Sequence, residues 1–106
     1  MPKPPASWKA FELRISRLIG GKRRGAYVSD GTQGKSDIIL DGFSIECKLL
    51  KQAGWQKILD ACRQAENNRE SELEIPIAII KKNSRGIPDK DSIVAMRLET
   101  FMEHFL

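Results

Sequence analysis

Three charged side chains, Asp37, Glu46 and Lys48, lie in or beside two short apolar runs in the stretch KSDIILDGFSIECK. The dipeptide Asp41-Gly42 separates the two runs, and a dipeptide of this kind between apolar segments is a strong signal for a β-hairpin. Carboxylates bind hard divalent cations, and an amine can neutralise an anion or position a water. These residue types could therefore support metal-assisted hydrolysis of a phosphate ester.

The register of the hairpin decides which charged groups face each other. If Leu40 pairs with Phe43, Asp37 lies opposite Glu46, and a four-residue loop on the same dipeptide gives the same register. A three-residue loop would shift the register by one. Because side chains alternate along strands, one face carries Asp37, Ile39, Ser44, Glu46 and Lys48, and the core face carries Ile38, Leu40, Phe43, Ile45 and Cys47. Carboxylates that face each other repel, which predicts a cation between them.

Mg²⁺ in proteins is bound through one or two carboxylates together with waters and phosphate oxygens. In the predicted hairpin, Asp37, Glu46 and the main-chain carbonyl of Cys47 are the oxygen donors within reach. Lys48 would orient or help deprotonate an attacking water, or neutralise charge on phosphorus. A Glu-x-Lys triplet alone is weak evidence, since a chain with 30% charged residues produces it by chance. Solvated residues of an edge strand are the alternative interpretation.

The elements that must position these residues follow from apolar periodicity and turn signals, and their order is α-β-β-β-α-β-β-α. This order predicts an α/β domain with a central mixed β-sheet flanked by helices. The expected elements are a helix from Trp8 to about Leu18 or Ile19, a strand at 26–28, the hairpin, a helix from about Ala53 or Gly54 to Asn67 or Asn68, strands at 75–81 and 92–98, and a short helix ending at Leu106.

Several residues have expected places within these elements. Ser7 is the expected N-cap of the first helix, and Thr100 with Glu103 matches a capping box for the last one. Glu12 is expected on the buried side of its helix. The run IPIAIIK at 75–81 is the best candidate for a central buried strand. The two tryptophans, Trp8 and Trp55, fall on apolar stripes, which favours core anchors over base-stacking platforms.

The composition of the 106-residue chain, with 41% apolar and 30% charged residues, is typical of a single globular domain. We expect a disordered lead over 1–7 and the folded domain over 8–106. No segment resembles a signal peptide or a membrane span. The cysteines Cys47 and Cys62 lack metal-type spacing and are expected to be core thiols of a reduced, cytoplasmic protein.

The net charge of +4 is unevenly distributed along the chain. Residues 1–36 contain eight Lys/Arg and two acids, hence +6, whereas residues 37–106 contain ten and twelve, hence −2. The excess peaks at Lys22-Arg23-Arg24 and favours a polyanionic partner, with nucleic acid the first candidate. On charge alone, a solvated basic loop is an equal alternative. Later in the chain, Lys81, Lys82 and Arg85 end a strand and could equally contact phosphate or remain solvated.

The sequence Asp37, then Glu46-Cys47-Lys48 on the next strand, resembles the D…(D/E)xK signature of the PD-(D/E)XK nuclease superfamily. Three further features match: Glu12 in WKAFELRI before a Gly-Gly-Lys-Arg-Arg turn, Ser36 beside the aspartate, and a later helix carrying Gln64-Ala65. Together these features resemble the archaeal-type Holliday junction resolvases and their phage-borne relatives, over residues 8–82.

The resemblance implies a restriction-endonuclease-like domain and a homodimer that nicks DNA with Mg²⁺ or Mn²⁺, encoded by a host, a phage or a mobile element. It implies metal ligands at Asp37 and Glu46 with Glu12 as an additional acidic member, a catalytic lysine at Lys48, and Gln64 approaching from the second helix. The expected DNA contacts are Lys22, Arg23, Arg24, Lys35 and Ser36.

Ser36 stands where the superfamily name has proline, and the chain is short for gripping a branched substrate. Two alternatives therefore stay open. One is a related nuclease acting on flaps, replication intermediates or linear DNA. The other is a non-catalytic basic DNA-binding module in which the carboxylates are only structural.

Overall fold

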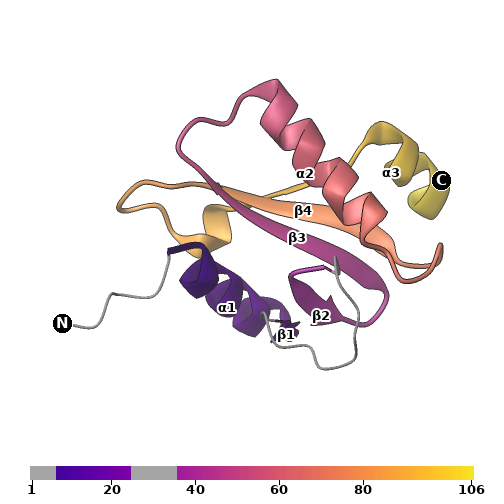
Figure 1. Ribbon diagram of the computed structural model, residues 1–106, viewed down its shortest axis with the longest axis horizontal. Helices are drawn as coiled ribbons and strands as arrows, with labels where there is room; N and C mark the ends of the chain where they lie inside the picture. Colours follow the sequence, from indigo (N-terminus) through magenta and orange to yellow (C-terminus); the bar gives the residue numbers. More distant parts are fainter. Residues whose placement is uncertain (1–6, 25–35) are drawn as a thin grey trace.

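The computed structural model describes residues 7–24 and 36–106. Its elements follow the predicted order, with one 3₁₀ helix added (Figure 1). They are α1 (Ser7–Ile19), β1 (Lys22–Arg23), β2 (Ile38–Leu40), β3 (Phe43–Leu50), α2 (Trp55–Asn67), β4 (Ile75–Lys82), η1 (Asp89–Asp91), β5 (Ile93–Ala95) and α3 (Leu98–Phe105). No helix among the described residues is long and apolar enough to cross a membrane.

The five strands form one open mixed sheet in the order β1-β2-β3-β4-β5. Strands β3 and β4 run parallel and every other neighbouring pair is antiparallel, which confirms the predicted α/β domain with a mixed sheet. Because parallel strands cannot be joined by a tight turn, α2 forms the crossover between β3 and β4. The run at 75–81 is an interior strand, as expected, although β3 occupies the middle of the sheet.

The hairpin register is the predicted one, with Leu40 opposite Phe43 and Ile38 opposite Ile45. Gly42 has a φ of 86°, a left-handed conformation that glycine adopts without steric cost, and this explains the tight turn after Asp41. The local signals of turn and alternation were therefore sufficient to place the two strands.

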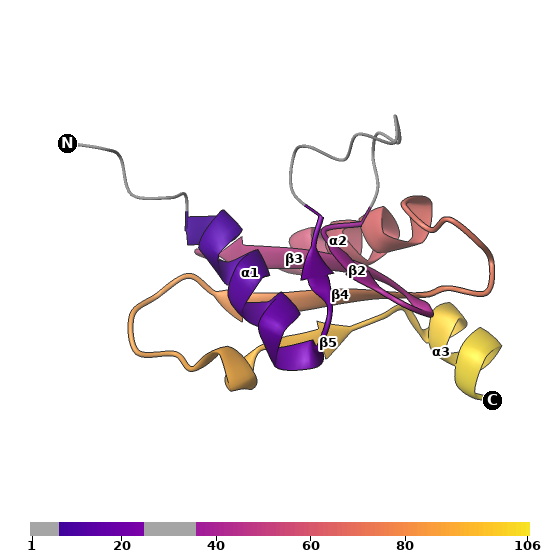
Figure 2. The ribbon, with the colours of Figure 1, turned by 90° about the horizontal axis from the view of Figure 1, so that it is seen from below.

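Helices α1 and α2 cover opposite faces of the sheet (Figures 1 and 2). On one face, Phe11 and Ile15 of α1 pack against a cluster that includes Ile38, Ile45, Cys47, Ile77 and Ile79. On the other face, α2 packs against β4, and this second cluster consists of Ala61, Cys62, Ala78 and Ile80. Both cysteines are buried free thiols, as predicted. The charged face of the hairpin is consequently covered by α2, and Ser44 and Glu46 are fully buried beneath it.

The first strand differs from its predicted place. It is Lys22–Arg23, directly after α1, whereas the predicted strand at 26–28 and the lead at 1–6 lie outside the described residues. Two glycines make the early turn possible. Gly20 has a φ of 79°, and a Cβ on Gly21 would lie 2.8 Å from Ile38 Cγ2. Ser7, assigned to the lead and to the N-cap, is instead the first residue of α1.

Two predictions about helix ends were wrong. Trp8 and Trp55 are 50% and 79% exposed rather than anchored in the core. Both lie in the first turn of their helices, where helical spacing does not reveal whether the sheet extends beneath them. The predicted capping box also fails, because α3 begins at Leu98 with Arg97 as its N-cap, so Thr100 lies inside the helix. The last strand is correspondingly shorter than 92–98 and ends at Ala95.

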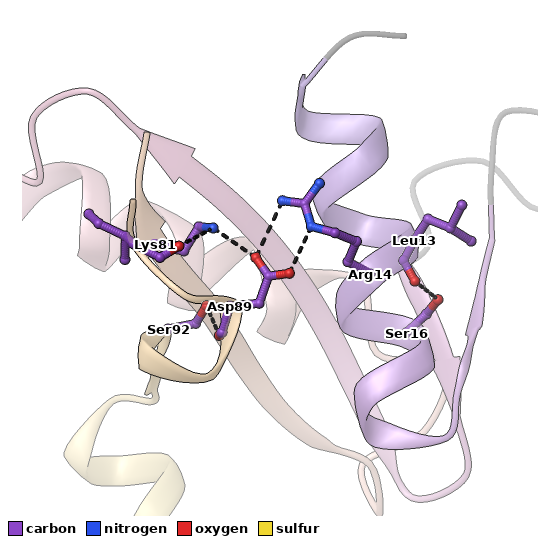
Figure 3. A network of polar contacts seen from close by, with 7 residues as sticks. Leu13, Arg14, Ser16, Lys81, Asp89 and Ser92 are labelled. Atoms are coloured by element: carbon purple, nitrogen blue, oxygen red, sulfur yellow. Dashed lines mark hydrogen bonds and ion pairs between the residues drawn. The ribbon is translucent and has the colours of Figure 1, made fainter. Parts of the chain in front are cut away.

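An ion-pair network ties the β4–β5 connection to α1 (Figure 3). Asp89 accepts from Arg14 Nε at 2.7 Å and from Lys81 Nζ at 2.7 Å. Lys81 also donates to the Ile87 carbonyl, and its ammonium lies 5.4 Å from the centroid of the Phe11 ring. Lys81 is therefore a buried structural cation rather than a solvated strand end or a phosphate contact.

Candidate active site

Asp37 is fixed at the start of β2 by three backbone contacts. Its amide donates to the Ile45 carbonyl, and its own carbonyl accepts from the Arg24 amide, each at 2.8 Å. Its carboxylate atom Oδ2 accepts a hydrogen bond from the Cys47 amide at 2.9 Å. The carboxylate is therefore held against β3 beside Glu46, the residue that the hairpin register places opposite it.

Glu46 is a fully buried carboxyl group in the middle strand. Its Oε1 accepts a 2.7 Å hydrogen bond from Asn68 Nδ2, whereas Oε2 is buried with no partner among the described residues. Burial, followed by the negative charge of Asp37 and a side-chain hydrogen bond with it, raises the pKa of Glu46 to about 8, against the opposing effects of Asn68 and Lys48. In the absence of a cation, Glu46 is thus mainly protonated at neutral pH.

Lys48 supplies the nearest positive charge to these carboxyl groups. Its side chain is half-buried and forms no hydrogen bond or ion pair within residues 7–24 and 36–106. Its charge nonetheless lowers the pKa of both Glu12 and Glu46, which shows that it lies within electrostatic range of both. A free ammonium group next to a raised-pKa carboxyl group is available to an anionic ligand.

Glu12 lies on the other face of the sheet from Glu46. It is 6% exposed, and its Oε2 accepts from Arg23 Nε at 2.8 Å. Burial and the charge of Asp37 raise the pKa of Glu12, while Arg23 and Lys48 lower it. The charge of Asp37 therefore acts on Glu12, and Glu12 already has a cationic partner in Arg23.

The carboxylate pair fits a hard divalent cation only in part. Among the described residues, no group of three or more His, Cys, Asp or Glu side chains could hold a metal ion. Asp37 and Glu46 provide two carboxylates, and Glu46 Oε2 is a buried acceptor that lacks a partner. Since Mg²⁺ commonly takes one or two carboxylates plus waters and phosphate oxygens, this donor set fits Mg²⁺ or Mn²⁺ when water and substrate complete the coordination.

Asn68, the C-cap residue of α2, rather than Gln64, contacts Glu46. Gln64 is exposed and its side chain makes no hydrogen bond within the part of the chain that the structure describes. A sequence signal for Asn68 existed, because it follows the buried residues Ala61 and Ala65 at helical spacings of seven and three. Those spacings place Asn68 on the side of the helix that faces β3.

The predicted DNA-contacting residues are mostly engaged within the protein. Arg23 pairs with Glu12, and Arg24 donates to the Ser36 carbonyl at 2.9 Å and pairs with Glu70 at 3.3 Å. Ser36 is buried, and its hydroxyl donates to the Ile38 carbonyl. Lys22 is exposed, and Lys35 lies outside the described residues.

Comparisons of the chain with protein-family models and curated proteins, and with solved structures, find no match. What the structure establishes is a compact α/β domain with three helices and a five-stranded mixed open sheet. The functional interpretation rests on the residues of the site.

Proposed function

We propose that this protein is a metal-dependent DNA endonuclease of the PD-(D/E)XK type, with a restriction-endonuclease-like fold and an activity resembling that of Holliday junction resolvases. One observation carries the proposal. Glu46 is fully buried opposite Asp37, its Oε2 lacks a partner among the described residues, and its pKa is raised to about 8. Strongly perturbed carboxyl groups with a specific charged neighbour are typical of functional sites.

In this proposal Asp37 and Glu46 hold Mg²⁺ or Mn²⁺, with the Cys47 carbonyl as a further donor. The bound ion would supply Lewis acidity and lower the pKa of a water. Asp37 is pre-oriented by the Cys47 amide and Glu46 by Asn68, so the free carboxylate oxygens are held in place before the ligand arrives. Lys48 would neutralise charge on the phosphodiester or position the attacking water. Glu12 would add negative charge from α1.

The substrate we propose is branched DNA, with a four-way junction first and flaps, replication intermediates or linear duplex as alternatives. A homodimer would suit a junction, since two sites could cut two strands. Exposed apolar side chains on β5 and α3, such as Ile93, Leu98 and Phe105, provide surface that a second copy could cover.

A non-catalytic DNA-binding module is the second candidate, and one observation favours it. Among the described residues there is no group of three metal ligands, and Glu12 already pairs with Arg23. In that case the Asp37–Glu46 pair would simply share a proton, and the protein would bind DNA without cutting it.

A cleavage assay separates these candidates. Wild type, Glu46→Ala, Lys48→Ala and the surface control Lys90→Ala are incubated with a four-way junction, a flap and a blunt duplex, in Mg²⁺ and in EDTA. The proposal predicts Mg²⁺-dependent cutting by wild type and Lys90→Ala that is lost in the two site variants. Symmetric nicks confined to the junction identify a resolvase. Binding without cleavage by folded wild type, in Mg²⁺ and in Mn²⁺, would refute the nuclease.

A further inference from the structure

Four cationic side chains and one indole are exposed where β3 and β4 end. Lys51 follows β3, Lys82 ends β4 and Arg85 follows it, while Trp55 and Lys57 lie in the first turn of α2. We refer to these five residues as the basic end. Because β3 and β4 are parallel, with Leu50 opposite Lys82, the chain leaves both strands on the same side of the molecule (Figure 1).

The segments that carry the basic end are in contact with one another. The Asn83 amide donates to the Leu50 carbonyl at 2.8 Å, which joins the two strand ends. A groove of about 320 Å³ lies beside the end of β4, and its lining includes Ala53 and Ile58, Lys82 and Ile87, and Ile93 and Ala95 of β5. Apart from Lys81, Lys82 and Asp91, its lining is apolar. Of the basic end, Lys82 lines this apolar groove.

The cations of the basic end differ from most other arginines and lysines discussed above. None of the four forms a hydrogen bond or an ion pair with a described residue, whereas Arg14, Arg23, Arg24, Lys81 and Arg97 all do. The acidic residues Glu72 and Glu74 lie between the C-terminal end of α2 and the start of β4, at the opposite end of the sheet from the basic end. The positive charge of the basic end is thus available to phosphates.

Trp55 is the least buried aromatic residue in the described chain, at 79% exposure, and it begins α2 between Lys51 and Lys57 in the sequence. An exposed indole offers a stacking platform, since every nucleobase has a π-face. In a duplex the bases stack on each other, so a protruding side chain stacks most readily on a base that is unpaired. An exposed indole together with unpaired cations therefore favours binding of an unpaired strand over binding of a duplex backbone.

We propose that the basic end binds a single-stranded segment of nucleic acid, with Trp55 stacking on an unpaired base and Lys51, Lys57, Lys82 and Arg85 contacting the flanking phosphates. As a feature of the substrate, this rests on the proposed nuclease function. Lys51 comes directly after β3 and five residues after Glu46, which is roughly 16 Å of extended chain, or about five stacked nucleotides. A branched substrate with an exposed single strand, such as the flap among the alternatives above, would engage this surface.

The test is a binding titration in EDTA, where no cleavage interferes. In the variant Trp8→Phe, Trp55 is the only tryptophan, so quenching of its fluorescence by a thymidine oligonucleotide reports stacking directly. We expect saturable quenching, and we expect Trp55→Ala to weaken binding of this oligonucleotide roughly 5- to 150-fold. Binding of a blunt duplex should change less than twofold.

The salt dependence of binding tests the contribution of the cations. The double substitution Lys51→Gln with Lys82→Gln should reduce the slope of log K against log salt by about 1.4 for a single strand. The control Lys90→Gln should leave it unchanged. Absence of quenching, an equal loss for oligonucleotide and duplex in Trp55→Ala, or an unchanged salt slope would each overturn the proposal.

The two proposals fail separately. Oligonucleotide binding through Trp55 without cleavage in Mg²⁺ would refute the nuclease and support this surface. Cleavage by a Trp55→Ala protein that still binds single strands as tightly as wild type would refute the surface alone. Because the substituted side chains are exposed, melting temperatures close to that of wild type verify that each variant is folded.

Discussion

Replacing Glu46 by glutamine should stabilise the protein. The amide keeps the oxygen that accepts from Asn68 and removes the negative charge next to Asp37. The pKa of Glu46 is raised from its ordinary value of 4.5 to about 8 in the folded state. Between these two pH values, which define the window of the effect, the folded state therefore binds more protons than the unfolded state. The stability of wild type therefore falls as the pH rises through the window, and glutamine abolishes this loss.

The size of the effect follows from the pKa shift. At about 1.4 kcal/mol per pH unit, the free energy of unfolding of wild type falls by about 3 kcal/mol between pH 4.5 and 7, and by about 5 kcal/mol by pH 9. The free energy of unfolding of Glu46→Gln should thus equal that of wild type near pH 4.5 and exceed it by several kcal/mol at pH 8. For a domain of this size, a gain of 3 kcal/mol corresponds to more than about 10 °C in Tm.

The assay is urea unfolding in EDTA at pH values from 4.5 to 9, with Glu72→Gln as the control because Glu72 is exposed. The control should follow wild type at every pH. If the stabilities of Glu46→Gln and wild type depend on pH in the same way, or if the variant is the less stable protein at pH 8, then the pKa of Glu46 is not raised in the folded state. The proposed site would lose its main support.

Two further predictions concern the surroundings of the site. Asn68→Ala removes the hydrogen bond that orients Glu46, so Mg²⁺-dependent cleavage should fall by about tenfold or more, as for other residues that orient metal ligands. Gln64→Ala should reduce cleavage less. A larger loss in Gln64→Ala than in Asn68→Ala would contradict the role of the Asn68–Glu46 hydrogen bond. Gly21→Ala places a Cβ within 3 Å of β2, so urea unfolding should show a loss of about 1–3 kcal/mol. Gly54→Ala, where nothing lies within 4 Å, is the matched control, and an equal loss in both would contradict the close packing of β1 on β2.

The hairpin was predictable because its signals are local. The Asp41-Gly42 dipeptide and the alternation on either side fix the turn, and the turn fixes the register that brings Glu46 opposite Asp37. The order of the helices and of the strands from β2 onward was predictable for the same reason, since these segments carry their own periodicity, whereas the two residues of β1 do not. Neither feature requires knowledge of residues far away in the sequence.

The covering of the site was not predictable from local pattern. Glu46 becomes fully buried because α2 crosses over that face of the sheet, which depends on the parallel pairing of β3 with β4. The charge sum of the first 36 residues likewise indicated the basic segment as the DNA-binding surface. In the fold, Arg23 and Arg24 are paired with acids. The cations of the basic end have no such partner among the described residues.

The measurement that tests the central claim most directly is the effect of Mg²⁺ and Mn²⁺ on the melting temperature at pH 8. If Asp37 and Glu46 hold a divalent cation, a concentration of 100 Kd should stabilise wild type by about 2.7 kcal/mol, which corresponds to roughly 10–20 °C. Asp37→Asn should show almost none of this shift. No shift in wild type with either metal, or an equal shift in Asp37→Asn, would contradict the metal site and the chemistry built on it.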